Sequence, residues 1–202
     1  KPGTLKKILG EKLLDIKSLK IIGAINGDDI FCLRKLLGGP EFDKDSRGIL
    51  SKLDLLESAI VEGGEWYYIH NNRQTKYYTN DNIIGKFMFS ECKNLEYIIL
   101  PEKTKIIDER AFWECKSLSN IIIPDIVTTL GESSFSGCKS IREFIFPRDV
   151  ITVGWNVFGI CLNLETVEIN KKLTSISQGM FSQCKSLKKI IIPDNVVNID
   201  RV

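Results

Sequence analysis

The chain lacks most of the side chains on which common enzyme and nucleic-acid sites depend. Its 202 residues include one histidine, His70, and the formal net charge is only +2. Any cysteine–histidine nucleophilic pair would need His70, which the sequence places at a hairpin tip, out of hydrogen-bond reach of the cysteine array. Lysines and arginines form no basic stripe interleaved with aromatics, so no nucleic-acid partner is expected.

Long apolar runs are also missing. No stretch approaches the ~20 consecutive apolar residues that cross a bilayer. The first residues, from Lys1 to Thr4, do not begin an apolar signal segment, so the protein is expected either to be cytosolic or to have lost a signal. The apolar fraction of 43% and the charged fraction of 27% are those of a folded, soluble protein.

A constant interval organises the residues that are present. Five of the six cysteines are spaced 23 residues apart: Cys92, Cys115, Cys138, Cys161 and Cys184. Phenylalanines stand three residues before them: Phe89, Phe112, Phe135, Phe158 and Phe181. A period of about 20 to 50 residues is typical of a solenoid, in which each repeat buries its apolar face against its neighbours. We therefore expect one continuous α/β solenoid without an internal domain boundary.

Three segments are predicted along this solenoid. Residues 1–60 read as an N-terminal cap, with one helix capped by Thr4 and another capped by Asn26 or Asp28. A strand over Ile16–Ile22 ending at Gly23, and a second strand at Leu53–Leu55, complete it. Residues 61–82 read as an inserted β-hairpin, because aromatic runs flank an Asn-rich tip. Residues 83–202 hold the regular repeats, each ending its strand at a proline such as Pro124, which cannot donate a ladder hydrogen bond.

The repeat pattern resembles a known bacterial family. Cys-x-x-Leu-x-x-Ile-x-Ile-Pro, then Val-x-x-Ile-Gly and a Phe three residues before the next Cys, closely resembles the BspA-like (Treponema pallidum-type, LRR_5-like) leucine-rich repeats over residues 83–202. Parts of residues 16–55 are similar to the capping region of secreted or surface members from gut Bacteroides-type bacteria. The resemblance implies an extracellular or cell-surface protein whose curved sheet binds other macromolecules, and it implies no enzyme and no cofactor.

The expected architecture is a right-handed superhelix with one parallel sheet on its concave side. Period-two alternation points one column of strand residues outward, onto the exposed face of that sheet. This outward column is Ile99, Ile122, Ile145, Glu168 and Ile191, and beside it run Tyr97, Asn120, Glu143, Thr166 and Lys189. Exposed isoleucines in a line are typical of a contact surface. The alternative is that β-branched residues simply favour strands.

The hairpin is a second candidate contact surface, through Trp66 and Tyr68. Large amphipathic aromatics are favoured at interfaces, although alternation predicts that about half of those in the hairpin pack onto the solenoid. Glu168, on an otherwise aliphatic column, and Asn170, in place of proline, depart from the repeat pattern. These departures predict a fourth unit that is locally frayed or functionally marked.

No metal site is expected. Zinc needs clustered ligands, whereas the cysteine column supplies one thiol per repeat, and the parallel direction of its side chains argues against disulfides. Buried small apolar residues are the simpler interpretation. Asp43 and Asp45 superficially resemble a calcium loop, but Arg47 stands where that loop needs an oxygen ligand, so a solvated turn is expected.

The combined prediction is an adhesin-like protein that binds a protein or a glycan outside the cell. A passive structural spacer is the alternative, followed by an enzyme with a cysteine nucleophile. The array also stops within a sixth unit, so end-to-end self-association through an uncovered strand edge is a further expectation.

Overall fold

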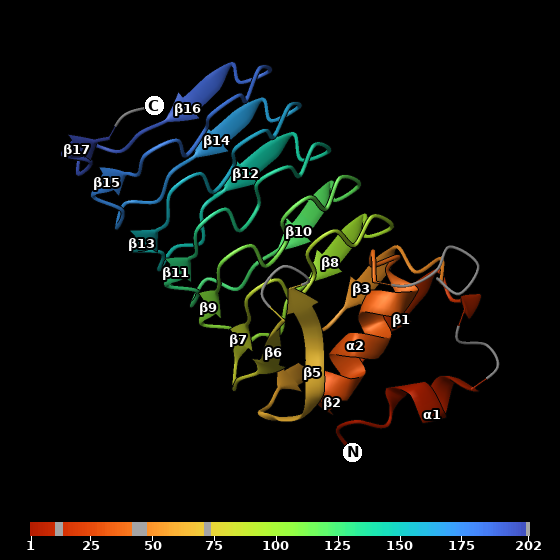
Figure 1. Ribbon diagram of the computed structural model, residues 1–202. Coiled ribbons are helices and arrows are strands. Elements are labelled where there is room, and N and C mark those ends of the chain that lie inside the picture. The colour runs from red at the N-terminus through yellow and green to blue at the C-terminus, as the bar shows by residue number, and fades with distance from the viewer. Residues whose placement is uncertain (11–13, 42–47, 71–73, 201–202) are drawn as a thin grey trace.

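A computed structural model describes residues 1–10, 14–41, 48–70 and 74–200. The chain winds into an elongated stack of similar coils, with its two ends at opposite ends of the stack (Figure 1). The predicted solenoid of parallel strands is confirmed. Asn71 to Arg73 at the hairpin tip, and Asp43, Asp45 and Arg47 of the calcium-loop hypothesis, lie outside the described residues.

One wall of the stack is a row of three-residue parallel strands, here called the long-strand row. Its members are β1 (Ser18–Lys20), β3 (Lys52–Asp54), β8 (Tyr97–Ile99), β10 (Asn120–Ile122), β12 (Glu143–Ile145), β14 (Thr166–Glu168) and β16 (Lys189–Ile191). The order is β1-β3-β8-β10 in one sheet and β12-β14-β16 in another. Within the array, each residue pairs with the residue 23 positions later, as Ile98 does with Ile121. The expectation of one unbroken sheet is therefore wrong.

A second wall holds shorter strands, the short-strand row, which the sequence did not predict as strands. Its members are β2 (Gly23–Ile25), β4 (Ser58–Ile60), β7 (Ile83–Ile84), β9 (Ile106–Ile107), β11 (Thr129–Leu130), β13 (Thr152–Val153), β15 (Ser175–Ile176) and β17 (Asn198–Ile199). Those in the array are two residues long, too short for an alternating pattern to identify. From β7 onward, turns connect each short strand to the next long one, and no helix lies among the described residues of this part.

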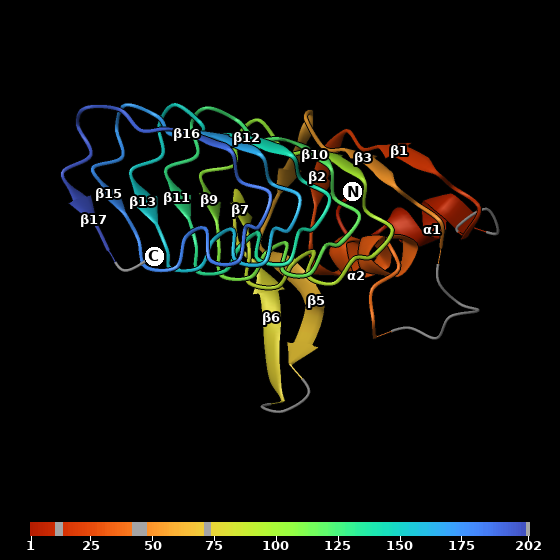
Figure 2. The ribbon, with the colours of Figure 1, turned by 90° about the horizontal axis from the view of Figure 1, so that it is seen from above.

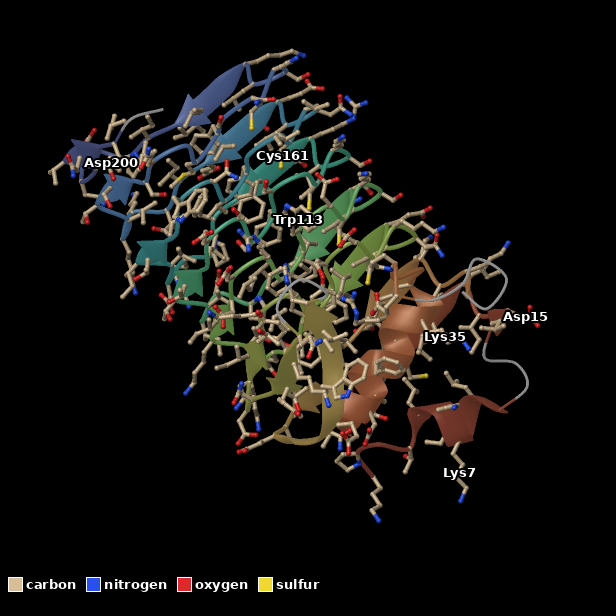
Figure 3. All side chains as sticks on the ribbon, in the orientation of Figure 1. Lys7, Asp15, Lys35, Trp113, Cys161 and Asp200 are labelled. Atoms are coloured by element: carbon tan, nitrogen blue, oxygen red, sulfur yellow. The ribbon has the colours of Figure 1, made fainter. Side chains whose placement is uncertain are left out.

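The core is built from the columns of the repeat. The phenylalanine rings stack along the axis, with centroid distances of 5.5, 5.4, 5.7 and 5.9 Å from Phe89 to Phe181. Sulfur atoms form a parallel line along the same axis in Figure 3, where Cys161 is labelled. Residues at a constant sequence interval thus become neighbours in one continuous core.

Residues 1–60 are less regular. Helix α1 (Leu5–Leu9) begins after Thr4 as predicted, but the Thr4 hydroxyl donates to the Lys1 carbonyl instead of capping the helix. Helix α2 (Gly27–Leu36) has Asn26 at its N-cap. The strand predicted over Ile16–Ile22 is shorter, and the chain forms β2 from Gly23, where the sequence suggested an end. Gly23 has a φ of 95°, which lets the chain bend between the two strands.

The predicted hairpin is confirmed. Strands β5 (Gly63–His70) and β6 (Thr75–Thr79) pair antiparallel. The hairpin projects from the side of the stack away from the long-strand row, next to α2 (Figure 2). Tyr67 anchors it, because this side chain is buried and its hydroxyl donates to the Lys86 carbonyl at 2.8 Å.

Candidate binding surfaces

The long-strand row exposes the predicted outward column. Ile122, Ile145 and Ile191 are 49%, 68% and 44% exposed, Glu168 is exposed, and Ile99 is half-buried. In the first four repeats the residues on either side of them are buried or half-buried, as Phe144 and Val167 are. In the last repeat Ile192, which alternation predicts to point inward, is also 44% exposed. An apolar line interrupted by one carboxylate therefore lies on the surface, in the orientation that alternation predicts.

The second predicted column runs beside it and is polar. Asn120, Glu143 and Lys189 are exposed, while Tyr97 and Thr166 are half-buried. At the edge of this column Glu165 accepts from both Arg142 and Lys188 at 2.7 Å. The hydrogen bond from Lys188 and its charge lower the pKa of Glu165. The face thus combines an apolar line with a rim of ion pairs.

The long-strand row is interrupted between β10 and β12. No backbone hydrogen bond joins these two strands, both of which lie wholly within the described residues. Figure 1 shows a wider separation there than between β8 and β10 or between β12 and β14. A cavity of about 340 Å³ opens at this place, lined by both strands. The sequence did not predict this break, because the hydrophobic pattern of the repeats continues unchanged from β10 to β12.

The hairpin aromatics are partly engaged with the solenoid. Trp66 is half-buried with its ring edge-on to Phe31 at 5.4 Å, and Tyr68 stacks on Phe87 at 5.2 Å. Tyr78 remains exposed. As alternation predicts, one part of the aromatic set packs inward and another part is accessible.

A groove of about 480 Å³ lies between the hairpin and the turns of the array. Aromatic and polar side chains line it together: Tyr68, His70, Phe87, Glu91, Arg110, Trp113, Ser133, Ser136, Trp155, Asn156 and Ile160. Trp155 is 50% exposed, and Trp113, labelled in Figure 3, is half-buried. The Nδ1 atom of His70 is buried and has no protein hydrogen-bond partner. Sequence reasoning missed this groove because its residues come from two separate segments.

Arg34 connects α2, the hairpin and the first repeat. Its side chain is fully buried, and its guanidinium pairs with Glu41. It donates to the carbonyls of Phe87 and Met88 at 2.9 and 3.1 Å and lies 4.7 Å from the ring centre of Tyr68. The sequence pattern did not identify Arg34 as important, because Arg34 is not part of the 23-residue repeat.

All six cysteines are free thiols, five of them buried and Cys184 half-buried. Cys115 donates to the carbonyl of Phe89, 26 residues earlier, at 2.9 Å, and Cys138 and Cys161 repeat this contact. Burial raises the pKa of Cys92 to about 12 and that of Cys32 to about 11. Thiolates are the nucleophilic and metal-binding form, so the structure disfavours both roles at these positions. Among the described residues no group of three His, Cys, Asp or Glu is placed to hold a metal.

Asn170 is well supported, so the fraying suggested by its departure from proline is wrong. Its side-chain amide donates to the carbonyl of Val150 at 3.0 Å. Its side-chain oxygen accepts from the backbone N–H groups of Lys172 and Leu173, both at 2.9 Å. The asparagine closes the turn through side-chain hydrogen bonds, in a position where proline would restrict the backbone instead.

Comparisons with known proteins identify the fold. The chain is 29% identical to a leucine-rich cell surface protein from Faecalibacterium prausnitzii A2-165, with a TM-score of 0.53, over 55% of this chain and 29% of that one. A leucine-rich repeat protein from Bacteroides ovatus matches with a TM-score of 0.50 and 19% identity, over 75% of this chain and 40% of that one. The chain thus spans well under half the length of these two structures.

No curated protein matches the sequence. Within the described ranges, no helix has the length and apolar character that crossing a bilayer requires.

The repeats match a known family model. The model of the BspA type leucine rich repeat region matches residues 82–202 in six copies, which is more than half of the chain. The chain belongs to the BspA-type leucine-rich-repeat family.

Proposed function

We propose that the long-strand row binds a partner protein outside the cell. The observation that carries this proposal is the line of exposed isoleucines, Ile122, Ile145 and Ile191, which runs across both sheets of the long-strand row. Burying such side chains on association would remove apolar surface from water at about 25 cal/mol per Å². The ion pairs of Glu165 at the rim would exclude partners of the wrong charge pattern.

The location and architecture follow the family. The relative from Faecalibacterium is described as a cell surface protein, which supports the same location for this chain. We take the stack to be a right-handed superhelix with the long-strand row on its concave side. Residues 1–60 would cap it, 61–82 form an inserted hairpin and 83–202 form the repeats. We propose no catalysis, because burial raises the pKa values of the thiols that a nucleophile would need.

Substitution of the isoleucine line tests the proposal against a passive spacer. The Ile122→Lys, Ile145→Lys variant should lose association with surface proteins of neighbouring or host cells, measured by capture and then by titration of the purified partner. The control is Ile126→Lys, Ile151→Lys, which changes two exposed isoleucines outside the long-strand row. Equal binding by wild type and both variants would support the spacer and overturn the proposal.

A glycan is a second candidate ligand, favoured by the groove beside the hairpin. Sugar rings stack their C–H faces on flat aromatic rings, while their hydroxyl groups bond to planar polar side chains. The groove offers Trp113 and Trp155 together with Arg110 and Asn156. Trp155→Ala should abolish binding on a glycan array, and Ile122→Lys, Ile145→Lys should not. An array without signal for the wild type would remove this candidate.

A further inference from the structure

The interruption between β10 and β12 affects only one wall of the stack. The same two repeats are joined in the short-strand row, where Thr129 of β11 pairs with Ile106 of β9. They are joined in the turns as well, where the Phe112 N–H donates to the Ser134 carbonyl at 2.8 Å. The Phe112 and Phe135 rings stack in parallel between them. The break is therefore a slot in one wall at a place where the other wall and the turns stay joined. The short-strand row has a separate break between β13 and β15.

The neighbouring strands show what the slot lacks. The Leu100 N–H donates to the Ile122 carbonyl at 3.0 Å, and the Phe146 N–H donates to the Glu168 carbonyl at 2.9 Å. The equivalent bond, from Ile123 to Ile145, is absent although both residues are described. In a parallel ladder alternate residues turn their N–H and C=O groups to each neighbour. Ile121 and Ile123 on β10, and Glu143 and Ile145 on β12, thus direct main-chain groups into the slot.

Two phenylalanines explain the break. At positions where the array otherwise has Ile, Leu or Val, the third unit carries Phe144 and Phe146. The Phe144 ring lies 4.5 Å from Phe158 and 5.4 Å from Phe135, inside the core. Additional volume in a close-packed core displaces the backbone. Displacement of β12 from β10 leaves Ile121 partly exposed, whereas its counterpart Ile98 is fully buried.

The groups that line the slot determine which ligand fits it. Its cavity is bordered by main-chain edges on two sides and by apolar side chains, including Ile121, Ile141 and Phe144, on the core side. Unpaired strand edges are templates for another strand. An extended peptide carries N–H and C=O groups on both edges and alternate side chains on one face, so it complements all three surfaces.

We propose that the slot between β10 and β12 takes up an extended segment of the partner protein as an added strand, with apolar side chains at alternate positions and no proline in the paired part. This inference rests on the proposed protein binding and names how the partner is held. The partner segment completes the long-strand row, and its main chain supplies hydrogen bonds that are independent of its sequence.

Hydrogen exchange of individual amides in the free protein is the first test. The N–H groups of Ile123 and Glu143 should exchange about a hundredfold faster than those of Leu100 and Phe146, which are bonded in the ladder. Equal protection at all four positions would mean that the sheet is closed in solution and would overturn the proposal.

A peptide with the sequence of residues 163–172 is the probe for uptake. It copies β14, which already pairs with β12 from the other side, and its charged residues keep it soluble. At about 1 mM it should slow exchange at Ile123 and Glu143 about tenfold. The same peptide N-methylated at the nitrogens of Val167 and Ile169 has lost two donors and should have no effect. Protection by both peptides, or by neither, would overturn main-chain recognition.

Closure of the slot separates this inference from the proposed function. The Phe144→Ile, Phe146→Ile variant should restore pairing of β10 with β12, protect the Ile123 amide and abolish peptide uptake. Circular dichroism would verify its fold. Should it still capture the partner as the wild type does, while Ile122→Lys, Ile145→Lys does not, the isoleucine line would bind without the slot. Sedimentation of the wild type distinguishes a partner segment from a second copy, which would appear as a dimer and contradict the proposal.

Discussion

The regular array and the first 82 residues are held together in different ways. In the array, equivalent contacts recur every 23 residues, as in the stack from Phe89 to Phe181. In the N-terminal part, single polar side chains make several contacts each. Asp29 accepts from the N–H groups of Gly3 and Leu5, and Arg34 joins α2 to the first repeat. Repetition distributes stability over many similar interfaces, whereas the N-terminal part depends on a few individual residues.

The largest expected effect breaks the array at its centre. Phe112→Ala should lower the free energy of unfolding by about 4 kcal/mol, because it removes a fully buried ring between two stacked neighbours. Urea denaturation followed by circular dichroism measures the loss. Ile151→Ala, at an exposed site, is the control and should change stability by less than about 0.5 kcal/mol. Similar losses in both variants would contradict a continuous core.

Removal of Arg34 tests the N-terminal side of the comparison. Arg34→Met should cost about 3 kcal/mol, because Glu41 and the carbonyls of Phe87 and Met88 lose their shared donor. Arg110→Met is the matched control, since Arg110 pairs with Glu109 and Glu132 at a half-exposed site and should cost below about 1 kcal/mol. Thermal melts of the two variants would show the difference, and equal shifts would argue against a dependence on single residues.

Alkaline pH should weaken the array through its thiols. Burial raises the pKa values of Cys115 and Cys138 well above the ordinary value, so above about pH 9 the unfolded chain loses protons that the folded chain retains. The contribution of these thiols to the free energy of unfolding is therefore fully present at neutral pH. It falls as pH rises, by about 1 kcal/mol for each thiol between pH 9 and 10. Urea unfolding at both pH values measures this, and Cys115→Ala, Cys138→Ala should show a shallower decline. An identical decline in the variant would assign the effect to other groups.

The smallest expected loss of stability concerns Asn170, which stands where the other repeats have proline. Asn170→Ala should cost about 1 kcal/mol, because the turn loses the bonds to Val150, Lys172 and Leu173. Asn163→Ala, at an exposed asparagine of the same repeat, should be neutral. Denaturant midpoints distinguish the two, and a neutral Asn170→Ala would mean that the side-chain bonds of the turn add nothing to stability.

The sequence was most informative where its pattern repeats. The interval predicted the stacking, the register and the outward direction of Ile122 and Ile145, because identical local geometry places equivalent residues side by side. The hairpin was predictable from its aromatic runs. Handedness of the stack and the roles of the surface residues stay predictions.

The remaining features depend on contacts that no local pattern encodes. Arg34 contacts Phe87 and Met88 across 53 and 54 residues, a contact that does not recur at the 23-residue interval among the described residues. Phe144 and Phe146 preserve the hydrophobic pattern, so their effect appears only when the volumes of neighbouring layers are compared. The groove with Trp113 and Trp155 forms because a separate hairpin projects beside the turns. These features depend on side-chain volume and on contacts between distant segments. The hydrophobic pattern of a sequence reports neither.

The line of thiols has a consequence for how the protein matures. Each sulfur from Cys115 to Cys184 is satisfied by a carbonyl of an earlier coil, so the array needs no oxidative cross-linking to hold its shape. Formation of a disulfide is therefore not a step in the folding of these repeats. Peroxide or an alkylating reagent would reach the interior sulfurs of the middle repeats only after adjacent coils had separated, so the rate of their modification reports on local unfolding.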